Sequence, residues 1–300
     1  MMTENFEAQP LGILRWQQAN VRFFAIAGTV AWVLVSLLGI RFLELPVMPI
    51  SIVGAAIGIF VAFRANQSYD RWWEGRKLWG RLINTSRHWC NQSIHLTDSA
   101  DREVAERMVK RHVVYVHVLR CLLRKQDPYR DQDARRHMTE ADTALEGSTN
   151  LTHALLDAQM AELAALSNAG RLAGHRLEVM DRTLMDLLNI QGGCERIKGT
   201  PLPRGVGFIA EMLIRIFSIM LPFAMAPELG IMVIPMNVLV CMAFALISEA
   251  GRVLEDPFNM FYNGLPLNAL SIKIERNLLE RLGTDELPPA VREAPFGVLM

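Results

Sequence analysis

Two sets of ionisable side chains in this 300-residue sequence have a spacing that could support chemistry. Glu211 and Arg215 lie four residues apart inside an apolar stretch, so they share one helix face and can pair there. Such a pair could act as a proton or ion relay, or it could be a structural ion pair that points away from lipid. His112 and His117 lie five residues apart and off one helix face, which indicates packing or surface histidines rather than a metal site.

No motif for catalysis or metal binding accompanies these side chains. The sequence contains no Walker loop, no G-x-S-x-G and no H-E-x-x-H. Cys90, Cys121, Cys194 and Cys241 stand far apart, which is typical of reduced thiols facing a cytosol. The formal net charge is +0, so no overall field favours nucleic acid. We therefore expect no enzyme, no cofactor and no bound metal.

Long apolar runs dominate the sequence, and one of them contains Glu211 and Arg215. Hydrophobic residues make up 51% of the chain and charged residues 21%, a high ratio for a soluble protein. Residues 23–40 and 46–63 carry no charge, and each approaches the roughly 20 residues that cross a bilayer. A second apolar block covers residues 205–248. We expect four transmembrane helices in two hairpins; for the first block, two buried helices of a large soluble core are the alternative.

Basic residues flank the apolar runs on one side. By the positive-inside rule, both termini and the middle of the chain are expected in the cytoplasm. The first 22 residues are polar and have no small-residue cleavage site, so we expect the first run to remain as a span. The flanking basic residues are Arg15 and Arg22 before the first run, Arg64, Arg71, Arg76 and Lys77 after the second, Arg196, Lys198 and Arg204 before the third, and Arg252 after the fourth.

The long middle of the chain is expected to be helical. Trp79, Leu82, Ser86 and Trp89 recur at three- and four-residue steps, and no alternating strand pattern is present. We interpret Trp79 and Trp89, together with Trp72 and Trp73, as interfacial anchors and subunit packing. The expected organisation is a cytosolic N-terminal segment (1–22), a transmembrane hairpin (23–75), a cytosolic helical region (76–204), a second transmembrane hairpin (205–252) and a cytosolic C-terminal segment (253–300).

Three blocks of this sequence resemble the bestrophin family. Each alone is a weak match, but three in family order are specific, and they extend over most of the chain, from about residue 20 to 280. The resemblance implies an all-α, polytopic membrane protein that forms a pentameric channel around one axial pore. It also implies that the second helix of the first hairpin (23–75) lines this pore. The blocks are residues 55–64 with Tyr69-Asp70-Arg71-Trp72-Trp73-Glu74-Gly75-Arg76-Lys77-Leu78-Trp79-Gly80, Gly192-Gly193-Cys194-Glu195-Arg196-Ile197 with Thr200-Pro201-Leu202-Pro203, and Asp256-Pro257-Phe258 with Leu265-Pro266-Leu267 and Ile274-Glu275-Arg276-Asn277-Leu278.

The resemblance also implies where the pore is narrow. In the family, three apolar residues spaced four apart form a hydrophobic neck, and counting back from Arg71 places them at Ala55, Ile59 and Phe63. These positions stack on one helix face whatever the family. Five copies of Ile59 and Phe63 would form apolar rings that can gate by dewetting; the alternative is that this face packs against a neighbouring helix. Ala55 is smaller than the usual family residue, so we do not expect a tight upper ring.

A second, cytosolic constriction is also implied by the family. Counting back from Cys194 places it at Glu178, where the family pattern is apolar. A ring of five carboxylates there would attract cations. The alternatives are a solvated acid on a helix, or a shift of one residue to Leu177 or Val179.

The acidic calcium clasp of animal bestrophins has no counterpart here. Residues 259–264 contain no acid, whereas calcium requires hard oxygen ligands. Calcium gating through this segment is therefore not expected.

The first hypothesis is a homopentameric channel in a bacterial inner membrane that conducts small monovalent ions. The missing clasp makes the chain similar to the bacterial branch of the family, which is linked to cations, so cations are favoured over anions. The alternatives are a chloride channel of the same architecture, or a non-conducting membrane scaffold or carrier. The expected partners are permeant ions, the lipid bilayer and further copies of the chain.

Overall fold

A computed structural model describes residues 17–261, 263–284 and 286–291. Over these residues the secondary structure is helical with no strand, so the predicted all-α class is confirmed. They form two compact units, which we treat one at a time. The apolar unit contains residues 17–72 and 201–255, and the polar unit contains residues 73–200 and the described residues from 256 onward. Residues 1–16 and 292–300, in the predicted N- and C-terminal segments, lie outside the described residues.

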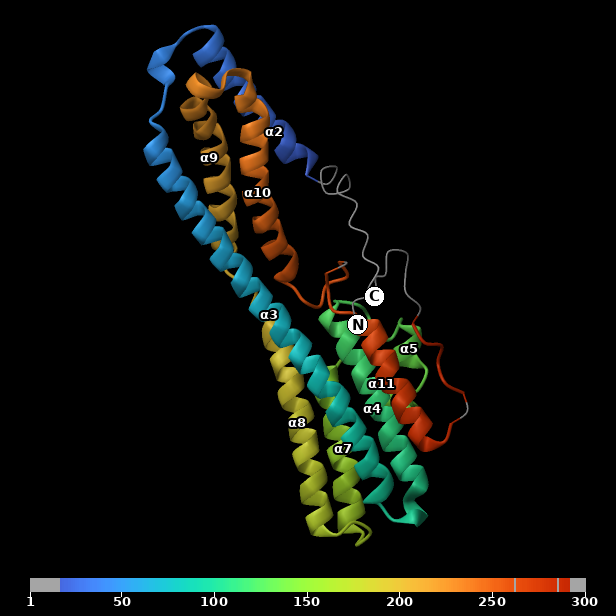
Figure 1. The fold of residues 1–300 in the computed structure, drawn as a ribbon. Coiled ribbons are helices and arrows are strands. Elements are labelled where there is room, and N and C mark those ends of the chain that lie inside the picture. Colours follow the sequence, from blue (N-terminus) through green and yellow to red (C-terminus); the bar gives the residue numbers. More distant parts are fainter. Residues whose placement is uncertain (1–16, 262, 285, 292–300) are drawn as a thin grey trace. The chain divides into compact units, whose positions relative to one another are not determined.

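The apolar unit is built from long helices (Figure 1). α2 passes directly into a π-helical turn, η1, and α10 follows α9 after the short 3-10 turn η4. α3 is one helix of 49 residues, of which residues 47–72 belong to this unit. The bounds are α2 Gln18–Ala31, η1 Trp32–Leu37, η2 Arg41–Leu43, α3 Val47–His95, α9 Arg204–Leu229, η4 Gly230–Met232 and α10 Val233–Leu254.

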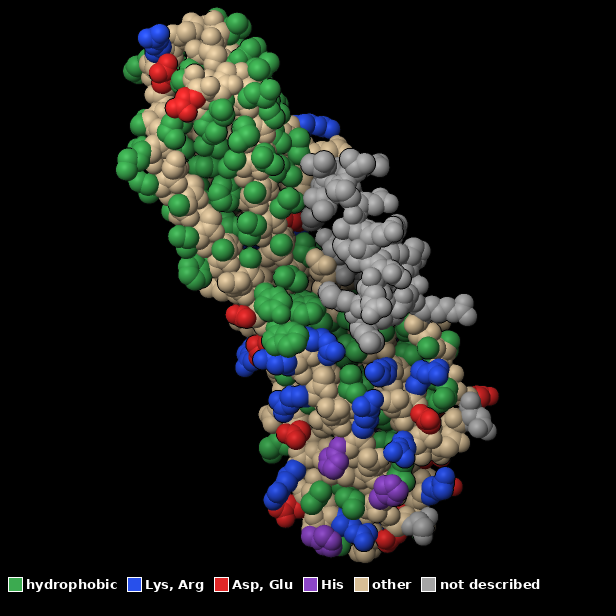
Figure 2. Space-filling view, viewed as in Figure 1, with side chains coloured by type: hydrophobic (Ala, Val, Ile, Leu, Met, Phe, Trp, Pro, Cys, Tyr) green, Lys and Arg blue, Asp and Glu red, His purple; other side chains and the backbone are tan. Residues whose placement is uncertain are grey.

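Apolar side chains both fill and cover this unit. Its core joins α2, α3, α9 and α10 through Phe24, Ile57, Phe217 and Met242, all of which are buried. Gly54 permits close helix packing, since a Cβ at this position would lie 2.9 Å from the Phe217 ring. The outward faces are apolar as well, as the green side chains over α3, α9 and α10 in Figure 2 show. A surface of this kind is typical of a protein in contact with lipid.

Three helical stretches are long and apolar enough to cross a membrane. They are Gln18–Leu37, Arg41–His95 and Gly205–Leu254. The sequence predicts four spans, and the difference arises in the last stretch, which contains both α9 and α10.

The polar unit packs the second part of α3 with helices α4, α7, α8 and α11. α4 contacts α7, α8 and α11, and α7 contacts α8. Two short helices, α5 and α6, lie in the connection between α4 and α7. The bounds are α4 Arg102–Leu123, α5 Gln132–Arg135, α6 Glu140–Thr143, α7 Leu151–Asn168, α8 Gly174–Gly199 and α11 Leu267–Leu282.

The tryptophans of this unit correct one prediction. Trp79 and Trp89 are both 0% exposed within the polar unit, so they are core residues and not interfacial anchors. Their spacing of ten residues places them on one face of α3, together with buried Leu82 and Ser86. The periodic pattern therefore marked a buried helix face correctly, whereas the interpretation of Trp79 and Trp89 was wrong. Trp73, by contrast, is 46% exposed.

Candidate ion pathway

The predicted neck residues lie on an uncovered face of α3. Ile59 is 60% exposed and Phe63 is 65% exposed, and Ala55 is exposed one turn earlier. On the opposite face of the helix, Ile57 and Val61 are buried in the core of the apolar unit. The four-residue spacing thus produces one apolar stripe that no other described residue of the chain covers.

A buried arginine directly follows this stripe. Arg64 is 7% exposed, and its Nη1 donates to Ser248 Oγ of α10 at 3.1 Å. Its Nη2 lies 3.9 Å from a carboxylate oxygen of Glu255. Gly207 of α9 makes room for the guanidinium, because a Cβ there would lie only 2.8 Å from Nη2. The apolar stripe therefore ends next to a fixed positive charge.

Glu178, the predicted cytosolic constriction, lies in the first turns of α8. Its side chain is exposed and accepts from Arg182 Nη2 at 2.6 Å, within the same helix. Val179 beside it is 45% exposed, and Leu177 is half-buried. Because Arg182 pairs with Glu178, five copies of this helix would present balanced charges rather than a purely acidic ring.

The predicted pair of Glu211 and Arg215 does not form an ion pair among the described residues. Both side chains are exposed on α9, and both line a cavity of about 220 Å³ with Gln17 and Ser248. Helix spacing made the contact possible, but these side chains do not pair across one turn.

A buried polar network in the polar unit escaped the sequence analysis. Glu275 of α11 is 0% exposed and accepts from His117 at 2.9 Å, from His137 at 3.0 Å and from Arg136 at 2.7 Å. Burial by itself raises the pKa of Glu275, but the hydrogen bonds and charges of these three partners outweigh burial and hold the pKa well below its usual range. The network joins α4, the segment after α5 and α11, so its role is structural.

The two histidines singled out in the sequence are both buried, which agrees with the expectation of packing residues rather than surface residues. His112 and His117 are each 0% exposed. His112 lies 2.9 Å from Ser86 Oγ, and burial lowers the pKa of His112 to about 3. His112 is therefore a neutral packing residue.

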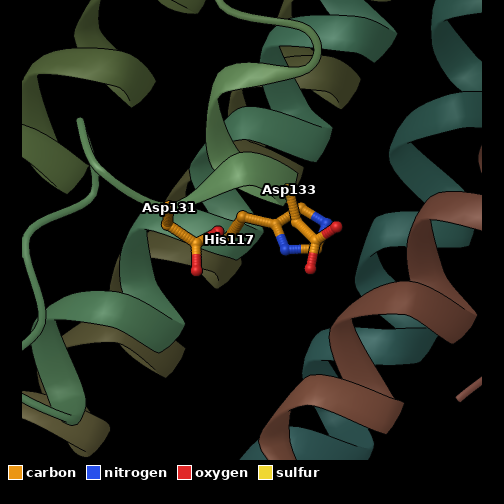
Figure 3. Close-up of side chains that lie close together, drawn as sticks. All are labelled: His117, Asp131 and Asp133. Atoms are coloured by element: carbon orange, nitrogen blue, oxygen red, sulfur yellow. The ribbon is translucent and has the colours of Figure 1, made fainter.

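Among the described residues, one cluster has the spacing of a metal site. Ligand atoms of His117, Asp131 and Asp133 lie within 4.8 Å of one another (Figure 3). Arg120, however, pairs with Asp131 and lies 3.6 Å from Asp133. Asp131 also accepts from the backbone N–H of Ala134 at 2.9 Å and so caps α5. Since Arg120 already compensates the two carboxylates, we interpret the cluster as part of the ion-pair network.

The segment that carries the calcium clasp in animal bestrophins is organised without acids here. Asp256, just before it, pairs with Lys198 at 2.7 Å. Asn259 Oδ1 accepts from the backbone N–H of Phe261 at 2.9 Å, which closes a turn. The amide oxygen of Asn259 is thus engaged in local structure.

The chain is similar to bacterial channel proteins over most of its length. A voltage-dependent anion channel-forming protein of Ralstonia nicotianae is 33% identical and aligns over 81% of this chain and 80% of its own. The corresponding YneE protein of Escherichia coli K12 is 35% identical over 85% of this chain and 82% of its own. A crystal structure of a bacterial bestrophin homologue from Klebsiella pneumoniae superposes with a TM-score of 0.82 at 32% identity, covering 89% of this chain and 98% of that one.

The family assignment rests on this similarity and on one further match. Residues 13–280 match the family described as bacterial/fungal bestrophin protein, a range that contains the apolar stripe of α3, Glu178 and most of both units. The relatives are channels rather than enzymes, in keeping with a sequence that has no catalytic motif. The chain belongs to the bacterial and fungal bestrophin family of membrane channel proteins.

Proposed function

We propose that this chain is one subunit of a pentameric channel for small monovalent anions in a bacterial inner membrane. The chain would cross the bilayer four times, as α2, the first part of α3, α9 and α10, with both termini and the polar unit in the cytoplasm. The observation that carries the proposal is the apolar stripe of Ala55, Ile59 and Phe63. It is exposed in one chain while the opposite face of α3 is buried, as expected for a helix that meets its own copies around an axis.

The neck would control permeation by dewetting. Rings of Ile59 and Phe63 offer an ion no hydrogen-bonding groups, so a narrow passage between them excludes water unless it widens. Ala55 has a short side chain, and its ring would be the wider entrance to the neck. A non-conducting scaffold would have no use for this stripe beyond subunit packing.

The preference for anions reverses the preference for cations predicted from the sequence. The Ralstonia and Escherichia relatives are both named as anion channel-forming proteins, which supports the chloride alternative. The cation preference depended partly on Glu178, and Arg182 at 2.6 Å compensates that charge. A compensated ring has little net field to attract cations.

Single-channel recording in reconstituted bilayers tests the proposal. We expect Ile59→Ala and Phe63→Ala to increase the single-channel current, because each widens the neck and removes apolar surface. Ile216→Ala is the matched control, since Ile216 is 50% exposed on α9 and outside the stripe, and it should leave the current unchanged. The absence of current from wild type and all variants would contradict the proposal and favour a scaffold.

Reversal potentials under a salt gradient decide the sign of the permeant ion. A shift toward the chloride equilibrium potential supports the proposal, and a shift toward the cation potential contradicts it. Native mass spectrometry of the detergent-solubilised protein measures the number of subunits, for which we expect five.

A further inference from the structure

A cavity in the apolar unit lies where α3, α9 and the end of α10 meet. Its volume is about 250 Å³, and Arg64, Glu211 and Glu255 line it together with Gly207 and Phe208. It therefore contains one guanidinium and two carboxylates at the edge of a largely apolar surface. Neither the neck stripe nor Glu178 belongs to it.

The cavity lies at the depth of lipid headgroups if these helices cross the bilayer as proposed above, and on that point the inference rests on the proposed function. Arg64 immediately follows the uncharged run of residues 46–63. Glu211 lies about 10 Å along α9 from its first residue, at 1.5 Å per residue. Phe208, which is 63% exposed, lines the cavity, and Met212 on the same helix is 44% exposed. These apolar side chains can contact acyl chains beside the cavity.

The charges in the cavity define the chemistry of a ligand. Arg64 uses Nη1 on Ser248, while Nη2 has only the distant Glu255 carboxylate at 3.9 Å, so it remains available to a phosphate oxygen. Glu211 forms no ion pair among the described residues, and its carboxylate can accept hydrogen bonds from an ammonium group. A purely anionic headgroup would meet two carboxylates, and a trimethylammonium group has no N–H to donate. The complementary ligand carries a phosphate and a primary ammonium a few ångströms apart.

We propose that this cavity binds the headgroup of a phosphatidylethanolamine-type membrane lipid. The phosphate contacts Arg64, the ammonium contacts Glu211 and Glu255, and the acyl chains lie along the exposed face of α9. Gly207 is a positioning residue for the phosphate contact, because a Cβ there would displace the guanidinium of Arg64. The helix dipole at the start of α9 adds a small favourable field for the phosphate.

Native mass spectrometry of the delipidated, full-length protein in detergent tests this site. Phosphatidylethanolamine, phosphatidylcholine and phosphatidylglycerol with identical acyl chains are titrated separately. We expect phosphatidylethanolamine to bind roughly tenfold more tightly than the other two, the factor expected for about one charged hydrogen bond. Glu211→Gln should remove most of that preference, and Gly207→Ala should weaken binding of phosphatidylethanolamine. Glu228→Gln, an exposed acid at the other end of α9, is the matched control and should leave the preference intact.

The outcomes separate this proposal from its alternatives. Equal affinity for the three lipids, a preference that survives Glu211→Gln unchanged, or phosphatidylethanolamine binding that Gly207→Ala leaves unchanged would overturn it. Soluble glycerophosphoethanolamine that binds as tightly as the lipid, with the same dependence on Glu211, would overturn the assignment to a membrane lipid. Thermal unfolding midpoints equal to wild type establish that the variants are folded. The readout is independent of current, so a protein that binds the lipid selectively but does not conduct would contradict only the channel proposal.

Discussion

The two units of this chain differ in the partners that their buried polar side chains use. The apolar unit exposes hydrophobic side chains, and within its span region buried Asn237 donates to helix backbones, to the carbonyl oxygens of Phe24 at 2.8 Å and Ser218 at 3.1 Å. The polar unit buries ionised groups and pairs them with one another, as Arg111 does with Asp142 and Glu162, each at 2.8 Å.

The difference reflects the solvent that each surface meets. Lipid is as apolar as the side chains it surrounds, so helices that pack in lipid gain little from hydrophobic burial. Because lipid offers no hydrogen bonds, their polar atoms must be satisfied within the protein. Water makes apolar burial favourable, and a unit with an apolar core can accommodate costly ion pairs that fix how its helices are arranged. The comparison predicts that removing a polar group is more destabilising in the polar unit than in the apolar unit.

The largest effect is expected at Glu275. Glu275→Ala leaves His117, His137 and Arg136 without their shared acceptor in a buried site. Breaking a buried charge network by removal of one partner costs about 3–5 kcal/mol, so the variant should unfold well below wild type in thermal melts followed by circular dichroism.

Glu280→Ala is the matched control for Glu275→Ala. Glu280 is an exposed acid on the same helix, and its loss should change the free energy of unfolding by no more than about 0.5 kcal/mol. Equal midpoints for the two variants would show that the network does not stabilise the polar unit.

His112 makes the polar unit sensitive to acid. Burial lowers its pKa to about 3, so it stays neutral in the folded state while it is protonated below pH about 6.5 in the unfolded state. Its contribution to stability is therefore complete above pH 6.5 and is lost as the pH falls toward 3. The loss is about 1.4 kcal/mol per pH unit, or about 2 kcal/mol between pH 6.5 and pH 5.

Chemical denaturation at several pH values measures the contribution of His112 to the free energy of unfolding. His112→Gln should remove most of the decline below pH 6.5, because a glutamine does not titrate. The control variant His95→Gln, at an exposed position on α3, should show the same decline below pH 6.5 as wild type. A decline of the same slope in wild type and His112→Gln would contradict the assignment.

Asn237 tests the same comparison in the apolar unit. Asn237→Ala removes two hydrogen bonds that connect α10 to α2 and α9, and we expect a loss of only about 1 kcal/mol, the range found for polar contacts between membrane helices. Ser51→Ala is the control, since Ser51 is exposed and donates only to the Val47 carbonyl of its own helix. A loss at Asn237 as large as that at Glu275 would break the comparison.

The sequence predicted periodic faces well and long-range polar contacts poorly. The core face of α3 with Leu82 and Trp89 follows from a helical period that local sequence displays. The network around Glu275 could not be found in this way, because its partners His117 and Arg136 are 158 and 139 residues away. Glu211 and Arg215 show the converse, since their spacing permitted an ion pair that the structure does not form. What the stripe of Ile59 and Phe63 faces stays a prediction, because it depends on other copies of the chain.

The smallest expected effect concerns the charges of α8. If five copies of Glu178 and Arg182 surround the ion pathway, Glu178→Gln leaves the arginines uncompensated and should move the reversal potential toward chloride, while Arg182→Gln should move it toward the cation. Both side chains are more than half exposed and salt screens exposed charges beyond about 8 Å, so each shift should be on the order of a few millivolts. The double variant should restore the wild-type value. A large shift for Glu178→Gln alone would show an uncompensated acidic ring and favour cations, and no shift for either variant would place α8 away from the pathway.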